Sequence, residues 1–177
     1  MNSKIYQAAS MATKTLGMNS TSPDDIVDCI QLHAGLAVAA AWIPIGGLDV
    51  AALTANIWTM YARINKFLGV SFSENIMKSI GSAVMANLAS NLALTGVAAA
   101  LKYIPGIGTF AGGMVMGAAV YGTTIGAAWI YLTAITNWAK KGKGSGNDLK
   151  SCIEEVINLN KDKINDIIQD EKANYSA

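Results

Sequence analysis

The sequence predicts an all-α fold in which two apolar helical hairpins form a four-helix body, with amphipathic helices at both ends of the chain. Capping signals before apolar segments, prolines after them and a middle almost without charge support this fold. The chain has 177 residues, of which 14% are charged, against a usual fraction of about 25%. Between residues 29 and 139 the only charged residues are Asp49, Arg63, Lys66, Glu74, Lys78 and Lys102.

The first hairpin is predicted from a helix start and a proline. Residues 22–25 read Ser-Pro-Asp-Asp, in which the serine can cap a helix and the second aspartate takes the capping-box position. That helix should end near Trp42, because Pro44 disfavours the α conformation in the residue before it. A second helix is expected over about 49–67.

The second hairpin is predicted in the same way. Residues 71–74 repeat the capping-box spacing and open a third helix. Nothing interrupts that helix strongly before Pro105. A fourth helix is expected over about 109–138, so that the hydrophobic double-hairpin domain covers 22–139.

Outside this domain the chain is more polar. Residues 1–21 form a weakly amphipathic N-terminal segment, and 140–147 form a flexible linker rich in glycine and lysine. The C-terminal segment, 148–177, is expected to hold one amphipathic helix, capped by Asp148 and ending near Ile168, and a tail. We expect its apolar stripe to dock, preferably on the chain's own helices; the stripe comprises Ile153, Val156, Ile157, Ile164, Ile167 and Ile168.

The two hairpin tips share a short repeat. Residues 42–47 and 103–108 both have an aromatic residue, then isoleucine, proline and glycine. Asp49 is explained by capping of the second helix, and the alternative is a membrane carboxylate that binds a cation or relays protons. The predicted tip residues are Pro44, Gly46, Gly47, Asp49, Pro105, Gly106 and Gly108.

Glycines in the fourth helix predict close helix packing. Gly113 and Gly117 form one GxxxG pair, and Gly122 and Gly126 form a second. Because glycine has no Cβ, such pairs let backbones approach. We favour contact within one molecule over self-association.

A polar stripe is predicted on the third helix. Asn87, Asn91 and Thr95 follow one another at intervals of four residues on one helical face. Hydrogen bonding between helices is the favoured role, and the wall of a water-lined pore is the alternative.

The charge pattern predicts association with membrane lipid. Residues 80–101 and 103–139 contain no charge, and both runs exceed the roughly 20 residues needed to cross the hydrocarbon core. The feet of a hairpin built from them carry the basic residues Arg63, Lys66, Lys78, Lys140, Lys141 and Lys143, whereas its tip carries only Lys102. The positive-inside rule then places the feet in the cytoplasm. The alternative is a cytoplasmic oligomer whose helices are buried between subunits.

Catalytic chemistry and metal or nucleic-acid binding are not predicted. His33 is the only histidine, and packing explains it better than a catalytic triad or a metal site does. Cys29 and Cys152 are expected to be buried thiols. A net charge of +1 gives no basic face for nucleic acid. We therefore expect no catalytic residue, no metal, no cofactor and no enzyme activity.

Residues 33–135 resemble the YcjF-like family, a bacterial domain of unknown function that is often associated with small GTPases. The similarity lies in Ile43-Pro44 with Gly47 and Asp49, in 60–64 with Gly69, and above all in 102–109. The resemblance implies an all-α, membrane-associated domain that works with a separate nucleotide-switch protein.

Three functional hypotheses follow. The first is a non-enzymatic, membrane-associated and self-associating helical-hairpin protein that acts as an anchor or scaffold for a partner such as a small GTPase. The second is a pore- or channel-forming protein. The third is a soluble oligomeric structural protein.

Overall fold

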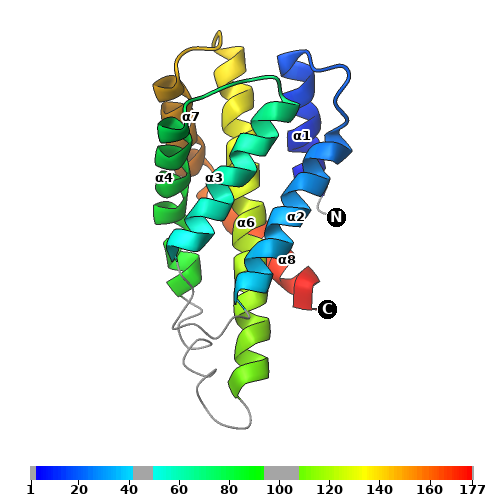
Figure 1. Ribbon diagram of the computed structural model, residues 1–177, viewed down its shortest axis with the longest axis vertical. Coiled ribbons are helices and arrows are strands. Elements are labelled where there is room, and N and C mark those ends of the chain that lie inside the picture. The colour runs from blue at the N-terminus through cyan, green and yellow to red at the C-terminus, as the bar shows by residue number, and fades with distance from the viewer. Residues whose placement is uncertain (1–2, 42–49, 94–107, 177) are drawn as a thin grey trace.

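The structure, a computed structural model, describes residues 3–41, 50–93 and 108–176. Within these ranges the chain forms seven helices and no strand, which confirms the all-α class (Figure 1). The helices are α1 (Ser3–Leu16), α2 (Pro23–Ala41), α3 (Val50–Phe67), α4 (Glu74–Ala93), α6 (Gly108–Lys140), α7 (Gly146–Leu159) and α8 (Lys161–Ser176).

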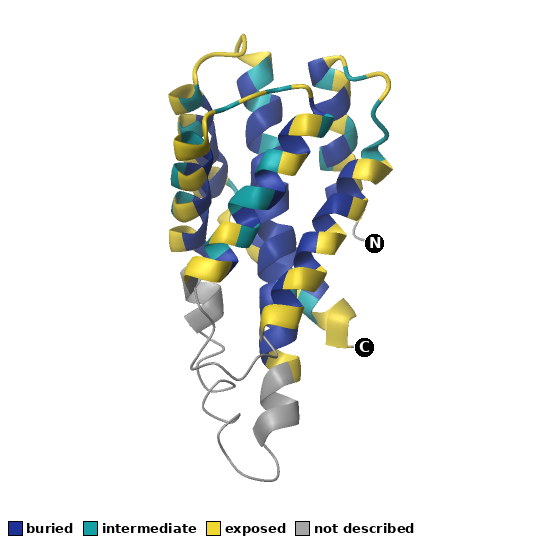
Figure 2. Ribbon diagram, viewed as in Figure 1, coloured by how far each residue is buried: buried dark blue, intermediate teal, exposed yellow. Residues whose placement is uncertain are grey.

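One long helix, α6, forms the centre of the bundle. It has 33 residues, a length of about 50 Å at ~1.5 Å per residue, and packs against all six other helices. From Met116 to Trp138 nearly every side chain is buried, as the blue interior in Figure 2 shows. A helix that is apolar on every side needs cover on every side, and the surrounding helices provide it.

The described helices do not confirm a separate four-helix body with helices appended at its ends. Helices α1, α7 and α8 contact α6 as directly as α2, α3 and α4 do. The chain therefore folds as one bundle around α6. The finer expectation of two hairpins depends on tips that lie outside the described residues.

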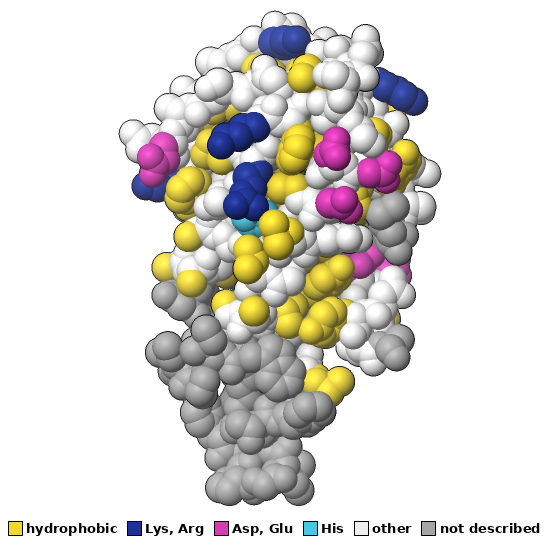
Figure 3. Space-filling view, turned by 45° about the vertical axis from the view of Figure 1, so that its right-hand side comes forward, with side chains coloured by type: hydrophobic (Ala, Val, Ile, Leu, Met, Phe, Trp, Pro, Cys, Tyr) yellow, Lys and Arg dark blue, Asp and Glu magenta, His cyan; other side chains and the backbone are white. Residues whose placement is uncertain are grey.

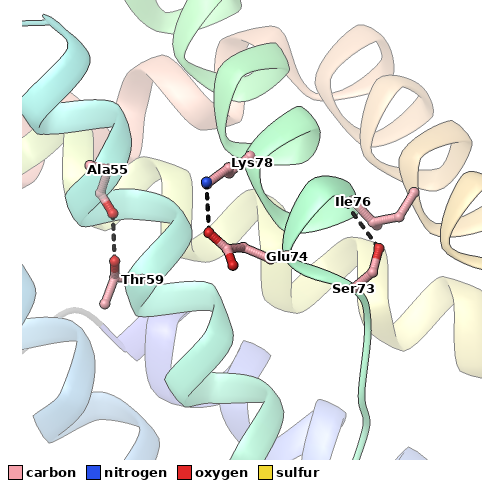
Figure 4. Close-up of polar contacts among 6 residues, drawn as sticks. All are labelled: Ala55, Thr59, Ser73, Glu74, Ile76 and Lys78. Atoms are coloured by element: carbon pink, nitrogen blue, oxygen red, sulfur yellow. Dashed lines mark hydrogen bonds and ion pairs between the residues drawn. The ribbon is translucent and has the colours of Figure 1, made fainter.

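Two helix starts follow the predicted chemistry with one correction. The amide of Ser22 donates to the Asp25 carboxylate at 3.2 Å, which is the reciprocal bond of a capping box. At the start of α4 the cap is Ser73 and not Ser71: the Ile76 amide donates to the Ser73 hydroxyl at 3.4 Å (Figure 4). Glu74 instead pairs with Lys78 one turn later, at 2.6 Å.

The predicted flexible linker is a short, hydrogen-bonded turn. Helix α6 runs to Lys140, and α7 begins at Gly146. Between them the Trp138 indole donates to the Gly144 carbonyl at 3.1 Å, and Gly142 and Lys143 have φ values of 101° and 57°. These conformations reverse the chain within a few residues.

The predicted single C-terminal helix is wrong in three respects. Its cap is Ser145, and Asp148 completes the capping box as the third helical residue. The helix breaks at Asn160, whose φ and ψ of −129° and 28° are not helical. Beyond the break, α8 continues past Ile168 to Ser176, where a tail was expected.

The docking of the C-terminal stripe on the chain's own helices is confirmed. All six stripe residues are buried: Ile153, Val156, Ile157, Ile164, Ile167 and Ile168. Both α7 and α8 pack on α6, and an ion pair between Lys4 and Asp170 (3.2 Å) also joins α1 to α8. Burial of the stripe therefore covers the central helix.

Two glycines of α6 allow α8 to lie this close. A Cβ on Gly122 would stand 2.6 Å from the Ile168 carbonyl oxygen, and one on Gly126 would stand 2.7 Å from the Ile168 Cγ1 atom. The first neighbour is backbone and cannot rotate away. The second GxxxG pair thus makes a contact within the molecule.

We predict that Gly122→Ala destabilises the protein by about 1–3 kcal/mol, because the added methyl group forces α8 away from α6. Gly35→Ala is the matched control, since nothing lies within 4 Å of a Cβ at this position in α2. The control should stabilise the protein by up to about 1 kcal/mol through helix propensity. Chemical unfolding measures both, and equal effects of the two variants would contradict the close contact.

Candidate functional site

One end of the bundle is formed by helix segments without charge. The C-terminal parts of α2 and α4 and the N-terminal parts of α3 and α6 point to the same end (Figure 1). We name these segments, residues 34–41, 50–62, 79–93 and 108–120, the charge-free end, because none of their residues is Asp, Glu, Lys or Arg. At ~1.5 Å per residue, the 13-residue segments of α3 and α6 are about 20 Å long.

Apolar side chains are exposed on the charge-free end. Leu36 on α2 is 50% exposed, and Val115 on α6 is likewise 50% exposed. Leu32, one turn before Leu36, extends this apolar face upward along α2. The other exposed apolar residues of the charge-free end include Ala39, Ala40, Ala51, Ala52, Ala55 and Met114. In Figure 3 several hydrophobic side chains lie in the middle part of the visible face, below most of the charged ones.

The opposite end carries charges of both signs, which Figure 3 shows in the upper part of the same face. The predicted basic feet lie toward this end, on the last part of α3, the first turns of α4 and the end of α6 with its following turn. Lys78 bonds Glu74, and Lys141 bonds Glu155 at 2.7 Å. The bundle is therefore polarised along its long axis.

An open groove of about 530 Å³ lies between α2 and α3 on this charged part. Asp25 and Asp28 contribute acidic groups, and Arg63 and Lys66 contribute basic groups. Cys29 also lines the groove; burial raises the pKa of its thiol, and the charge of Arg63 opposes that rise. A thiol with a raised pKa is a poor nucleophile, so Cys29 behaves as the expected buried thiol.

His33 joins α2 to α3 through a pair of hydrogen bonds. Its Nδ1 atom lies 2.8 Å from the Asn56 Oδ1 atom, and the Asn56 amide donates to the His33 carbonyl at 2.9 Å. Because Asn56 uses its NH₂ group on that carbonyl, its oxygen faces the ring and the proton resides on Nδ1. The His33 Nε2 atom is buried and has no hydrogen-bond partner among the described residues. His33 therefore has the packed role that was expected.

A second buried network joins α3, α4 and α6. The Tyr131 hydroxyl donates to the side-chain Oδ1 atom of Asn65 at 2.6 Å, and the Asn65 side-chain NH₂ group contacts the Met77 sulfur at 3.4 Å. The Tyr61 hydroxyl donates to the Ala127 carbonyl, and its ring stacks on Tyr131 with centroids 4.1 Å apart. These contacts explain how Tyr61 and Tyr131 can be wholly buried.

The predicted site residues fall into three groups. Pro44, Gly46, Gly47, Asp49, Pro105 and Gly106 lie outside the described residues, as do Thr95 and Lys102. Gly108 is the first residue of α6, and Gly113 and Gly117 follow within it. Gly122 and Gly126 contact α8.

The polar stripe is described at one side chain only. Asn87 is exposed, and its amide donates to the Ala83 carbonyl of its own helix at 2.8 Å. This bond does not join α4 to another helix, unlike the favoured expectation. Asn91 belongs to α4 as well.

The sequence reasoning missed a cavity beneath α8. Its lining includes Glu171, Tyr121 and Tyr175, and the Glu171 Oε1 atom is buried with no hydrogen-bond partner in the part of the chain that the structure describes. Helical periodicity does not distinguish Glu171 from the many other polar residues of α8. Only the packing of α8 against α6 brings it into a cavity.

Among the described helices, one stretch, Met114–Lys140, is long and apolar enough to cross a membrane. In the most apolar 18-residue stretch of this helix, 89% of the residues are buried inside the bundle. Its length and composition permit membrane association, and the same properties suit the core helix of a soluble bundle.

Comparison with known proteins gives no further assignment. No family model matches the chain, and neither curated proteins nor solved structures yielded a match. The YcjF-like resemblance and the GTPase partner that it implies therefore stay predictions from the sequence.

We predict that the stability of the fold decreases below about pH 6.5 through His33. Burial lowers the pKa of His33 and the charge of Arg63 lowers it further, against the hydrogen bond with Asn56. The folded protein thus binds fewer protons than the unfolded chain. Well above the ordinary pKa of histidine, which applies to the unfolded chain, His33 should not affect the free energy of unfolding. As the pH falls from there toward the lowered pKa of His33 in the folded protein, the free energy of unfolding should decrease by at most about 1.4 kcal/mol per pH unit.

Urea unfolding at a series of pH values between 5.5 and 7.5 measures this slope. The His33→Gln variant is the control, because the chain has no other histidine and glutamine does not titrate. Its slope should be flatter than that of the unaltered protein. The same slope in both proteins would assign the pH dependence to other groups.

Proposed function

We propose that this chain is a non-enzymatic, membrane-associated helical protein that inserts its charge-free end into lipid and acts as an anchor or scaffold. The single observation that supports the proposal is the polarity of the bundle. Four described helix segments that contain no charged residue meet at one end and expose leucine, valine, methionine and alanine there. An exposed apolar surface gathered at one end is typical of a membrane- or protein-binding site.

The dimensions suit partial insertion. The charge-free end is about 20 Å long, against about 30 Å for the hydrocarbon core of a bilayer. Lys172 of α8 packs beside Gly122, just above the uncharged segment of α6, so insertion should stop near this level.

The charged end would then face the cytoplasm. Its basic residues on α3, α4 and the end of α6 satisfy the positive-inside rule. The groove between α2 and α3, with both acidic and basic side chains, offers an aqueous surface for the partner. A GTPase as that partner rests on the sequence resemblance alone.

Self-association is also part of the proposal, and its surface must lie away from α8. Gly122 and Gly126 are already occupied by Ile168 of the same chain. The exposed apolar face around Leu36 remains open on the described surface. Copies could pack through this face within the membrane.

We predict that Leu36→Asp lowers the partition of the purified protein onto phospholipid vesicles at least tenfold. A charge in hydrocarbon costs about 2.5–3.5 kcal/mol, and about 1.4 kcal/mol corresponds to tenfold. The matched control is Leu159→Asp, because Leu159 is 75% exposed at the end of α7 and lies outside the charge-free end. Vesicle flotation measures both variants, with thermal unfolding to show that each is folded.

The control should float as the unaltered protein does. Failure of the unaltered protein to float, or its complete release by salt wash, would contradict insertion. Equal flotation of the two variants would contradict the assignment of the membrane-binding surface.

Pore formation is a second candidate function. It is favoured by the packing of α1, α7 and α8 over the long apolar helix α6. This helix has no charge before Lys140 and is shielded by α1, α7 and α8, so that release of these helices would free a segment long enough to span the bilayer. Dye release from vesicles separates the two functions. Binding with release favours a pore, and binding without release favours an anchor.

A further inference from the structure

The cavity beneath α8 has the dimensions of a small-molecule site. It measures about 550 Å³, within the roughly 300–1,000 Å³ that such sites occupy. Four helices contribute to it: Ile5 comes from α1, Ile30 from α2, Tyr121 from α6, and Glu171 and Tyr175 from α8. A molecule bound there would contact four helices at once.

A buried carboxylate is the unusual feature of this cavity. Glu171 is only 6% exposed, and its Oε1 atom has no hydrogen-bond partner in the described structure. None of the described lining residues is a lysine or arginine that could neutralise it. Burying a carboxylate without a compensating charge is unfavourable. A cation bound beside Glu171 would therefore be stabilised.

The other walls select the kind of cation. Tyr121 and Tyr175 stack with ring centroids 5.1 Å apart, and aromatic faces attract organic cations. Ile5, Ile30 and Ile125 supply apolar surface. A metal ion of the Mg²⁺ or Ca²⁺ type prefers several oxygen ligands, and no group of three or more metal-ligating side chains occurs among the residues described.

We propose that this cavity binds a small organic ammonium ion, whose charged group pairs with Glu171 and lies against the tyrosine pair while its apolar body contacts the isoleucines. This site is separate from the charge-free end. The proposal therefore does not depend on membrane association.

Calorimetric titration of the full chain with phenethylammonium tests the proposal, and phenethyl alcohol is the neutral probe of nearly the same shape. The protein should bind the ammonium ion at one saturable site, at least tenfold more tightly than the alcohol. Glu171→Gln, which keeps the shape and removes the charge, should abolish this preference. Glu154→Gln, at an exposed position on α7, should retain it.

Tyr175→Leu is a second variant, because this side chain is 41% exposed and its replacement leaves the buried carboxylate in place. It should weaken ammonium binding by about two- to fivefold through loss of the cation–π contact. Thermal unfolding of each variant without ligand shows that the fold is retained.

Several results would overturn the proposal. One is the absence of saturable binding, as expected of a cavity that holds only water. Equal affinity for the two probes, or an unchanged preference in Glu171→Gln, would also do so. Binding of Mg²⁺ or Ca²⁺ that depends on Glu171 and excludes phenethylammonium would assign the cavity to a metal ion instead.

Discussion

The burial of α6 on all sides is the constraint on which the rest of the structure depends. A helix of 33 residues without charge before Lys140 cannot leave any face in water over its middle part. Six helices surround it, and the isoleucine stripe of α7 and α8 supplies the last part of the cover. Glycines at 122 and 126 bring α8 close enough to complete it, and the same approach creates the cavity that contains Glu171.

Among the described residues the cover of α6 is incomplete at one end, and this difference gives the described bundle its polarity. Helices α7 and α8 carry most of the charge of the C-terminal part; α7 lies beside the upper part of α6, and α8 crosses its middle (Figure 1). Beyond them, α2, α3, α4 and α6 continue with apolar and small side chains, several of them exposed. The buried middle of α6 resembles a soluble core, whereas the charge-free end resembles a surface made for lipid or for another apolar surface. One chain thus combines a water-compatible bundle with an apolar end.

Much of the local structure could be predicted from the sequence, because capping residues and prolines act over a few residues. The starts of α2 and α6 and the extent of α3 were expected within one or two residues. The docking of the isoleucine stripe could also be predicted, since an apolar stripe of that size does not stay in water. The break at Asn160 was missed because no proline or glycine marks it. Ser145 and Asp148 are both good capping residues, so their roles depend on where the turn after Lys140 ends.

The arrangement around α6 and the candidate sites could be predicted only in part. A run without charge is the same signal for a membrane span and for a fully buried core helix, so the sequence could not show that the middle of α6 is enclosed by the other described helices. The separation of charged residues from long uncharged runs could be seen in the sequence. The charge-free end of the bundle is formed by parts of those uncharged runs. Glu171 could not be identified, because its place in a cavity whose described lining has no lysine or arginine depends on contacts among α1, α2, α6 and α8.

The depth of single nitroxide labels in vesicle-bound protein tests the central claim most directly. With the buried Cys29 and Cys152 replaced by serine, one label at position 36 on the charge-free end can be compared with one at position 71 between α3 and α4, which is exposed at the opposite end. The account predicts that the label at 36 collides with oxygen dissolved in the lipid and is shielded from a water-soluble nickel complex, while the label at 71 shows the reverse. Equal access of the nickel complex to both labels in vesicle-bound protein would contradict insertion of the charge-free end.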